Sequence, residues 1–418
     1  MGSHPGATRR AGRRRVTEPR AIVAGAGVFG LTAAIELRRR GYAVTLLDPG
    51  PLPHPLAAST DISKLIRMDY GPDADYLVAM EDALARWREW NTAWPEPLFH
   101  ETGVVFLTSS PMAPGGYEYE SWQLTLAHGH RPERLDATAI RHRFPAWNAE
   151  RYVDGYFNPE GGYAQSGRVV TWLVERALNA GVDLRSGQTF DRLLDAKRGS
   201  RTAGVVTRDG SRFTGEQVVL ALGSWTPHVL PWTQEFFRSS GMPVFHLRPA
   251  QPELFASERF PGFCADVNDT GYYGFPLHPV AGVVKIANHG DGRQMAPDAP
   301  ERVVTASETQ HLRAFLKDTF PALAAAEIVY TRVCLYCDTW DGHFWIAPDP
   351  QREGLVLATG DSGHGFKFAP LLGEWIADAV EGRPNPILPK FRWRPEVHPP
   401  RGEEASRYYP GSVQVNRL

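Results

Sequence analysis

The residues whose types and spacing point most clearly to a function are three glycines with the spacing GxGxxG. Gly25, Gly27 and Gly30 follow a short apolar run and open a stretch with helical spacing of apolar residues. Such glycines permit a tight turn and let backbone N–H groups approach a pyrophosphate at a helix N-terminus. Asp48 ends the next apolar run, where a carboxylate can accept from a ribose hydroxyl. The pattern predicts dinucleotide binding; the alternative is a plain glycine turn.

The identity of the dinucleotide is narrowed by two features. The acidic Asp48 argues against NADP, whose 2′-phosphate is better accommodated by an arginine. The glycine motif alone does not separate FAD from NAD. A later apolar strand pattern, residues 218–222 closed by Gly223, favours FAD, because such a strand commonly passes beneath the dinucleotide in flavin-binding proteins. Its alternative is an ordinary core strand.

Lys285 lies inside an apolar strand pattern over residues 283–287, with His289 on the same face. Burial would lower the pKa of this lysine, and lysines perturbed in this way are concentrated at functional sites. The alternative is an edge-strand lysine whose ammonium reaches water along its apolar stem.

Cys334 and Cys337 suggest a metal site or a redox disulfide. A zinc site would need two further ligands, and none follows at a suitable spacing. Alternation along a strand over 330–336 places Cys334 on the face of Arg332 and Tyr336, with Cys337 on the opposite face, against disulfide geometry. We therefore expect no metal site, and two ordinary buried cysteines are the simplest alternative.

A glycine-rich loop, residues 360–368, leads through Pro370 into a last helix pattern over 371–380. The N-terminus of that helix would offer N–H donors and positive partial charge to a reduced flavin. Lys64 and Arg67, three residues apart, could hold a substrate carboxylate or a flavin phosphate. The alternatives are a structural loop and a solvated charged face.

These residues need secondary structure to position them. A strand over 21–24, a helix over 31–40 ended by Gly41 and a strand over 44–47 form a β-α-β unit. Further helices are predicted over 76–94, 169–180 and 371–380. Further strands are predicted over 104–107, 182–184, 205–206, 218–222, 272–275, 283–287, 330–336 and 355–358.

Composition excludes several classes of protein. The 418 residues are enough for two or three domains. Lys plus Arg number 45 against 47 for Asp plus Glu, and a net charge of −2 lacks the basic footprint of nucleic-acid binding. Three cysteines cannot form a secreted disulfide framework, and no run approaches the ~20 apolar residues of a membrane span. We expect a cytoplasmic protein without nucleic-acid or membrane partners.

Taken in chain order, the motifs resemble those of the D-amino-acid-oxidase-like flavoproteins, and within them the monomeric sarcosine oxidase and fructosyl amino acid oxidase branch. The similarity covers roughly residues 20–394. The matching segments are residues 25–30, 61–71, 272–276 with Lys285 and His289, 331–336, and 360–368. Residues 358–364 and 391–395 favour the fructosyl amino acid oxidases.

This resemblance implies a fold of the α/β (α+β) class, with a Rossmann-type FAD-binding domain and a second, mixed or antiparallel-sheet substrate domain. The implied FAD-binding domain is discontinuous, over residues 20–96, 160–230 and 335–394. The substrate domain would comprise residues 97–159 and 231–334. A basic flexible arm, 1–19, and a tail, 395–418, would flank them.

The resemblance also implies roles in catalysis. Lys285 is placed like the lysine near flavin N5 that promotes the reaction with oxygen, and His289 is similar to an active-site histidine. Tyr273 and Tyr336 would line the substrate cavity. Two cations would hold the substrate carboxylate, namely Arg67 and Lys367.

Cofactor contacts are implied in the same way. Cys334 corresponds to the thiol that forms a thioether to the flavin 8α-methyl group, so the FAD is expected to be covalently attached. Lys64 stands where sarcosine oxidases often have arginine. The complete set of implied cofactor-binding residues is Gly25, Gly27, Gly30, Asp48, Ser59, Lys64, Cys334, Gly363, His364, Gly365 and Lys367.

The expected activity is FAD-dependent oxidation of the C–N bond of a secondary (N-alkyl, N-glycated or cyclic) amino acid or related amine. Oxygen would reoxidise the flavin and leave as hydrogen peroxide, and we expect a monomer. Two alternatives stay open: a flavin amine dehydrogenase with another electron acceptor, and a nucleotide-binding sensor without turnover.

Overall fold

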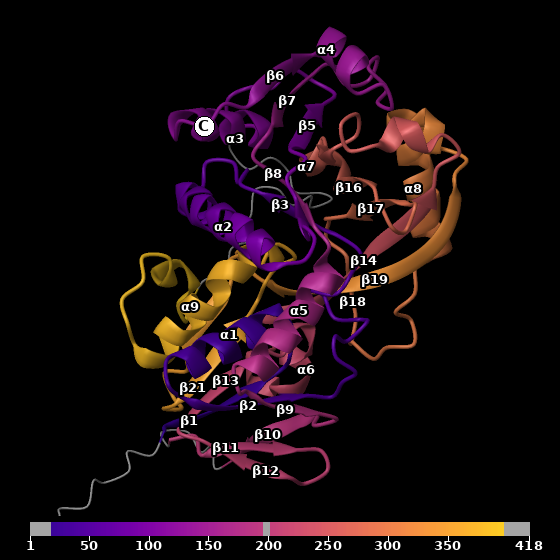
Figure 1. The fold of residues 1–418 in the computed structure, drawn as a ribbon. Helices are drawn as coiled ribbons and strands as arrows, with labels where there is room; N and C mark the ends of the chain where they lie inside the picture. The colour runs from indigo at the N-terminus through magenta and orange to yellow at the C-terminus, as the bar shows by residue number, and fades with distance from the viewer. Residues whose placement is uncertain (1–17, 195–200, 397–418) are drawn as a thin grey trace, which may run out of the picture.

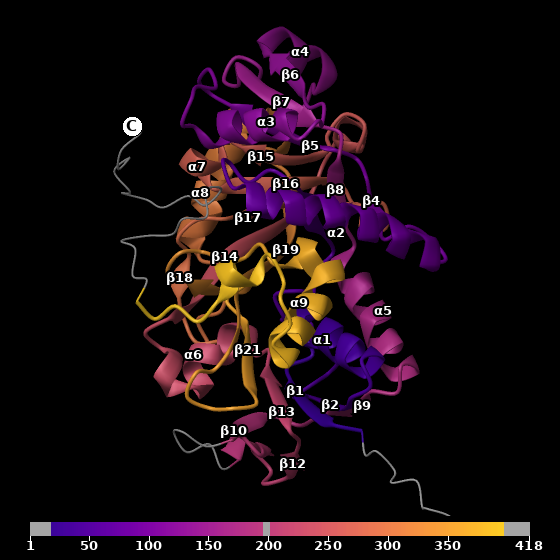
Figure 2. The same cartoon turned by 90° about the vertical axis from the view of Figure 1, so that its left-hand side faces the viewer.

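The computed structural model describes residues 18–194 and 201–396 (Figure 1). The predicted basic arm and tail therefore lie almost entirely outside the described residues. Two large sheets dominate the fold, one at each end of the molecule, and helix α2 (Ala74–Ala93) lies between them in both views (Figures 1 and 2).

The first sheet has six strands and contains the predicted β-α-β unit. In spatial order they are β20 (Trp345–Pro348), β21 (Leu355–Thr359), β13 (Gln217–Leu220), β1 (Arg20–Ala24), β2 (Ala43–Asp48) and β9 (Asp183–Ser186). All pairs are parallel except β20 with β21. Residues 21–24 are buried throughout, as is typical of a parallel strand covered on both faces.

Helices cover one face of this sheet. α1 (Val28–Arg39) packs between α5 (Ser166–Asn179) and α9 (Ala369–Glu381) (Figure 1). α1 begins three residues before the predicted start, because the glycine turn leads directly into its first turn. A small antiparallel sheet adjoins β1 and β13; its strands are β10 (Phe190–Leu194), β11 (Gly204–Thr207) and β12 (Arg212–Thr214).

The second large sheet has nine strands from two distant parts of the chain. They are β5 (Val104–Thr108), β6 (Glu133–Asp136), β7 (Asp154–Asn158), β14 (Phe237–Arg248), β15 (Gly262–Ala265), β16 (Tyr272–Leu277), β17 (Val284–Asn288), β18 (Arg293–Gln294) and β19 (Glu327–Thr339). β5 and β15 pair in parallel and join the two parts. Both parts lie in the predicted substrate domain except for the end of β19, residues 335–339, which falls in the predicted FAD-binding domain. The domain boundaries stay a prediction.

A third, three-stranded sheet consists of β3 (Lys64–Arg67), β8 (Gly161–Ala164) and β4 (Phe99–His100). The remaining helices are α3 (Tyr117–Ala127), α4 (Ala137–Arg143), α6 (Thr226–Val229), α7 (Val267–Thr270) and α8 (Ala306–Thr319). In the described part of the chain, no helix is both long and apolar enough to cross a bilayer.

Candidate active site

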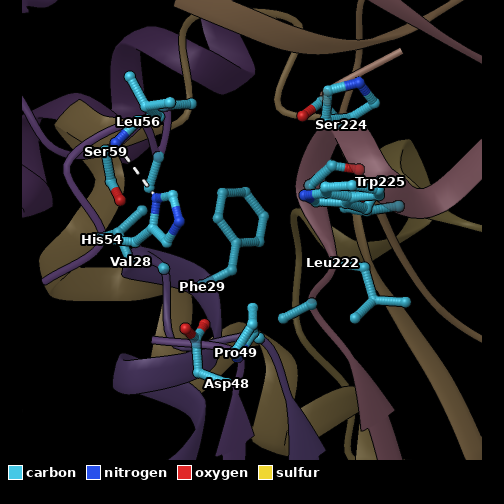
Figure 3. Close-up of a pocket in the computed structure, with 18 of the residues that line it drawn as sticks. Val28, Phe29, Asp48, Pro49, His54, Leu56, Ser59, Leu222, Ser224 and Trp225 are labelled. Carbon is cyan, nitrogen blue, oxygen red and sulfur yellow. Dashed lines mark hydrogen bonds between the residues drawn. The ribbon is translucent and has the colours of Figure 1, made fainter. Parts of the chain in front are cut away.

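A cavity of about 480 Å³ opens where the parallel strands of the first sheet end. Gly25 follows β1, Asp48 ends β2, Ala221 follows β13 and Thr359 ends β21, and all four line it. This edge of an open α/β sheet is the usual place for a dinucleotide. In Figure 3, His54, Leu56 and Ser59 form one wall and Ser224 and Trp225 the other, with Phe29 between them.

Two of the glycines let the backbone segments beside this cavity pack more closely than any side chain would allow. Gly25 has φ +99°, and a Cβ there would lie 2.3 Å from the carbonyl oxygen of Ala221. A Cβ on Gly30 would lie 1.8 Å from the carbonyl oxygen of Gly25. Gly27 is the N-cap of α1 and has no side chain to bond the first-turn N–H groups. Those donors suit a pyrophosphate.

Asp48 lies at the base of the cavity (Figure 3). Its Oδ2 accepts from the N–H of Ala26 and its Oδ1 from that of Gly50, both at 2.8 Å. These bonds fix the carboxylate, and each oxygen keeps a further lone pair for a ribose hydroxyl. The cavity volume, the glycine turn and the anchored acid together fit FAD.

A second, smaller cavity of about 50 Å³ adjoins the first, and Lys64, Gly363 and Phe366 line both. The other residues that line it are Leu65, Arg67, Cys264, Val267, Tyr273, His289, His364 and Lys367. The structure thus brings together four of the residues predicted to bind substrate, from β3, β16, the segment after β17, and the glycine-rich loop. A ligand in this cavity would lie beside a ligand in the larger one.

Lys367 is buried at the end of a chain of hydrogen bonds. Its Nζ donates to the Tyr70 hydroxyl at 2.9 Å, and the hydroxyl lies 2.9 Å from Nδ1 of His364. Nε2 of His364 lies 2.9 Å from the carbonyl oxygen of Gly342, which can only accept. The network therefore assigns the His364 proton to Nε2, so that Nδ1 accepts from Tyr70. His364 and Tyr70 position the lysine.

Arg67, the last residue of β3, is also buried and bonds to the backbone just beyond the end of that strand. Its Nη1 donates to the carbonyl oxygen of Asp69, and its guanidinium lies 4.9 Å from the centre of the Tyr70 ring. The Asp69 carboxylate accepts from Tyr156 at 2.9 Å and from Asn158 at 3.3 Å. Burial raises the pKa of Asp69. Asp69 orients Arg67 and balances part of its charge.

Lys285 is 1% exposed on β17, which is an interior strand between β14 and β16. The edge-strand alternative is therefore wrong. Its Nζ lies 2.8 Å from Oδ2 of Asp61 and donates to the carbonyl oxygen of Ser63 at 2.5 Å. Burial lowers the pKa of Lys285 to about 8, although Asp61 opposes that shift.

Lys64, rather than Lys285, is the lysine found among the residues that line both cavities. Its Nζ lies 3.8 Å from Sγ of Cys334. Burial lowers the pKa of Lys64, but electrostatic interaction with Cys334, Tyr273 and Asp61 outweighs it and holds the pKa above its ordinary value. The two lysines and Asp61 form one charge cluster beside the junction of the cavities.

The cysteines occupy separate surroundings. Cys334 packs with Met242, Val244, Ala287 and Tyr336, whereas Cys337 belongs to the cluster beneath the first sheet. All three cysteines are free and buried. Burial raises the pKa of both the Cys337 and the Cys264 thiols to about 12. Among the described residues, no group of three His, Cys, Asp or Glu side chains could hold a metal ion.

The aromatic site residues surround the junction. The His289 ring lies 6.4 Å from that of Tyr273 and 5.7 Å from that of Tyr336. Tyr336 lines the larger cavity and Tyr273 the smaller one. Gly363 has φ +77°, and a Cβ there would lie 2.2 Å from the Tyr336 ring, so only glycine fits.

The family of the protein follows from a match over most of its length. Residues 20–379 match the family model described as DAO, FAD dependent oxidoreductase. The chain belongs to this family. The prediction of an FAD-dependent oxidoreductase is therefore confirmed, as are the predicted resemblance and fold class.

Curated relatives of this family member include two bacterial oxidases. N-methyl-L-tryptophan oxidase of Salmonella dublin is 29% identical over 381 residues, which cover 89% of this chain and 97% of that protein. Monomeric sarcosine oxidase of Bacillus sp. (strain B-0618) is 28% identical over 377 residues, covering 87% and 92%.

Solved structures of the same fold include two fungal enzymes. Fructosyl peptide oxidase from E. terrenum superposes with a TM-score of 0.80 at 23% identity and covers 94% of this chain and 96% of its own. Amadoriase I from Aspergillus fumigatus gives 0.77 at 24%, with 92% of each chain covered. At these identities the likeness shows the fold alone.

In this FAD-dependent oxidoreductase, part of the predicted donor site before the last helix is used by the backbone itself. The 3-10 helix Phe366–Phe368 precedes α9 directly, and the N–H groups of Phe368 and Ala369 bond to the carbonyls of Gly365 and Phe366. These two N–H groups are therefore not available to a ligand. Gly365 packs against Phe29, where a Cβ would lie 2.9 Å from the ring.

Sequence reasoning missed several residues of the site. Tyr70 lies within the matching segment 61–71, but its hydrogen bond with Lys367 could not be predicted from the sequence. Cys264 and Val267 line the small cavity from β15 and α7, with no motif to mark them. Trp225 lines the larger cavity two residues after Gly223, the glycine that closes the β13 pattern.

Proposed function

We propose that the protein oxidises the C–N bond of a secondary amino acid or related amine, whether N-alkyl, N-glycated or cyclic, with oxygen as electron acceptor and hydrogen peroxide as product. One observation carries the proposal: the buried cations Arg67 and Lys367 line a small cavity that shares part of its wall with the dinucleotide cavity. The names of the two bacterial relatives, N-methyl-L-tryptophan oxidase and monomeric sarcosine oxidase, support it.

Substrate binding is assigned to the two cations. A carboxylate between the buried Arg67 and Lys367 side chains would form charge-assisted hydrogen bonds. Tyr273 and His289, which line the same cavity, would restrict where the amine can lie. Fixed orientation of this kind supplies much of the rate of such reactions.

Cofactor binding is assigned to the large cavity. Bound FAD would accept a hydride equivalent from the carbon next to nitrogen and pass the electrons on to oxygen. Gly25, Gly27 and Asp48 would hold its dinucleotide portion, with Ser59 and Lys64 on the adjoining wall. Cys334 is the proposed thioether attachment, supported by its place beside Tyr336 and Lys64.

Oxygen activation is assigned to the lysine cluster. A buried ammonium stabilises negative charge that develops on oxygen as it is reduced. We assign this role to Lys285, with Lys64 as the neighbouring cation. The division into an FAD-binding and a substrate domain, the monomeric state and the cytoplasmic location belong to the same proposal.

The test is a panel of amines assayed for hydrogen peroxide with the purified holoenzyme. N-methyl, fructosyl and cyclic amino acids are each paired with the corresponding primary amino acid or carboxyl-free amine. We expect peroxide from at least one secondary amino acid and far less from its carboxyl-free partner. Flavin reduction without peroxide would indicate a dehydrogenase, and no reduction by any amine would indicate a sensor.

A further inference from the structure

One face of the nine-stranded sheet carries residues of the proposed site in rows. β19 contributes Cys334 and Arg332, and β17 contributes Lys285, at positions that point to the same side. β14 runs between these strands and places His246 opposite Lys285. His246 therefore lies on the same face as the proposed site, yet it lines neither of the two cavities.

His246 is linked to Lys285 through Asp61. Nε2 of His246 lies 3.6 Å from Oδ1 of Asp61, and Nζ of Lys285 lies 2.8 Å from Oδ2 of the same carboxylate. Nε2 is buried and has no hydrogen-bond partner among the described residues. The gap is slightly longer than a hydrogen bond, so a small rotation or one bridging water closes it.

The outer end of this row reaches solvent. Tyr330 on β19 lies opposite His246, with the two ring centres 4.9 Å apart. Tyr330 is 46% exposed, His246 is 7% exposed, and Lys285 is 1% exposed. Exposure thus falls in steps from the surface to the buried lysine.

From this geometry we propose that His246 carries protons from solvent, by way of Asp61, to Lys285. The proposal rests on the oxidase activity proposed above and on the role of Lys285 in it. It makes His246 a positioning and proton-carrying residue that touches neither substrate nor cofactor.

The proton balance explains why such a path is needed. Oxygen takes up two electrons and two protons to become hydrogen peroxide, and the reduced cofactor supplies both electrons and one proton. Lys285 gives the second proton from Nζ and becomes a neutral amine. A proton then leaves Nε2 of protonated His246, binds the Asp61 carboxylate and is delivered to Nζ, and His246 is recharged by water.

The charges around Asp61 favour this order of events. Burial raises the pKa of Asp61, but Lys285, His246, Lys64 and Arg332 hold it well below its ordinary value. Once Lys285 is neutral, the strongest of these influences is gone and the carboxylate accepts a proton more readily. The ionisable groups facing His246 are Asp61, Lys285, Tyr330 and, from the turn after β16, His278.

The test is stopped-flow reoxidation of the substrate-reduced holoenzyme, in H₂O and in D₂O. We expect His246→Gln to slow reoxidation by roughly ten- to a hundredfold. This factor is at or below the smallest rate enhancement, about 10²-fold, that proton transfer by a positioned side chain typically supplies. The solvent isotope effect should rise in the variant. Tyr330→Phe keeps the ring beside His246 and is the matched control.

The outcomes separate this inference from the proposed function. A His246→Gln enzyme with the wild-type rate and the wild-type isotope effect overturns the proton path while leaving the oxidase intact. If Lys285→Met also reoxidises normally, the proposed role of Lys285 fails with it. His246→Asn is the second variant: if both amide variants lose the cofactor, His246 is structural and the proposal is wrong.

Discussion

Replacement of Lys285 by methionine tests the oxygen-activating role, because methionine keeps much of the volume and removes only the charge. With a pKa of about 8, Lys285 is mostly protonated at pH 7. Loss of one preorganised electrostatic partner typically slows catalysis by about 10²–10³-fold. We expect that factor in reoxidation, with little change in anaerobic reduction by substrate.

The Lys285→Met substitution should also lower the stability of the protein. The Asp61 carboxylate is 3% exposed and would lose its closest cation, and breaking a buried ion pair typically costs about 3–5 kcal/mol of stability. His246, Lys64 and Arg332 remain nearby and should reduce that cost. The double variant Lys285→Met with Asp61→Asn removes both charges and so leaves no unpaired buried charge. If the single variant loses flavin, the double variant should retain it.

The assay separates the half-reactions in a stopped-flow instrument. The enzyme is first reduced by substrate without air and then mixed with oxygenated buffer, while flavin absorbance is followed. Wild-type reoxidation should fall as the pH rises through about 8, because the ammonium is then lost, and the variant should lack this dependence. Lys64→Met is the matched comparison. If Lys64→Met slows reoxidation and Lys285→Met does not, the assignment to Lys285 is refuted and Lys64 takes its place.

Three further predictions concern substrate and cofactor binding. Arg67→Ala should bind carboxylate inhibitors about ten- to a hundredfold more weakly, the loss of about 1.5–3 kcal/mol expected for one charge-assisted partner, with flavin retained; an unchanged inhibition constant would count against the clamp. Cys334→Ser should release its flavin on acid precipitation while wild type and Cys337→Ser keep it, and free flavin from wild type would contradict the thioether. Tyr70→Phe removes an acceptor of Lys367, so KM should rise several-fold with kcat nearly unchanged; an equal fall in kcat would contradict a positioning role.

The part of the fold that could be predicted from the sequence is the part with strong local signals. The glycine spacing and the apolar run of β1 over residues 21–24 determine the β-α-β unit almost by themselves. β14 escaped prediction because Gly241 and Pro243 interrupt its twelve residues, and both residue types argue against a strand interior. α3 escaped because it buries Glu118, Ser121 and Thr125, so its buried face has no apolar period.

The candidate site divides in the same way. Arg67 and Lys367 stand in recognisable local motifs, and their meeting in one cavity follows from the resemblance to known flavoproteins. Tyr70 was missed as a partner of Lys367, because that hydrogen bond joins residues 297 positions apart. His246 belongs to no motif, and only the pairing of β14 with β17, which places it opposite Lys285, points to a role for it. Contacts of this kind depend on tertiary packing, which single-sequence patterns do not encode.

The most direct test of the central claim is a single reduction and reoxidation cycle followed by eye or by absorbance. The yellow holoenzyme is mixed without air with the secondary amino acid that gives most peroxide in the panel, and air is then admitted. We expect the flavin absorbance to bleach fully, to return on aeration, and to release one hydrogen peroxide per flavin, with Arg67→Ala bleaching only at much higher substrate concentration. A flavin that no secondary amine bleaches, or that stays bleached in air, would contradict an amine oxidase built on this site.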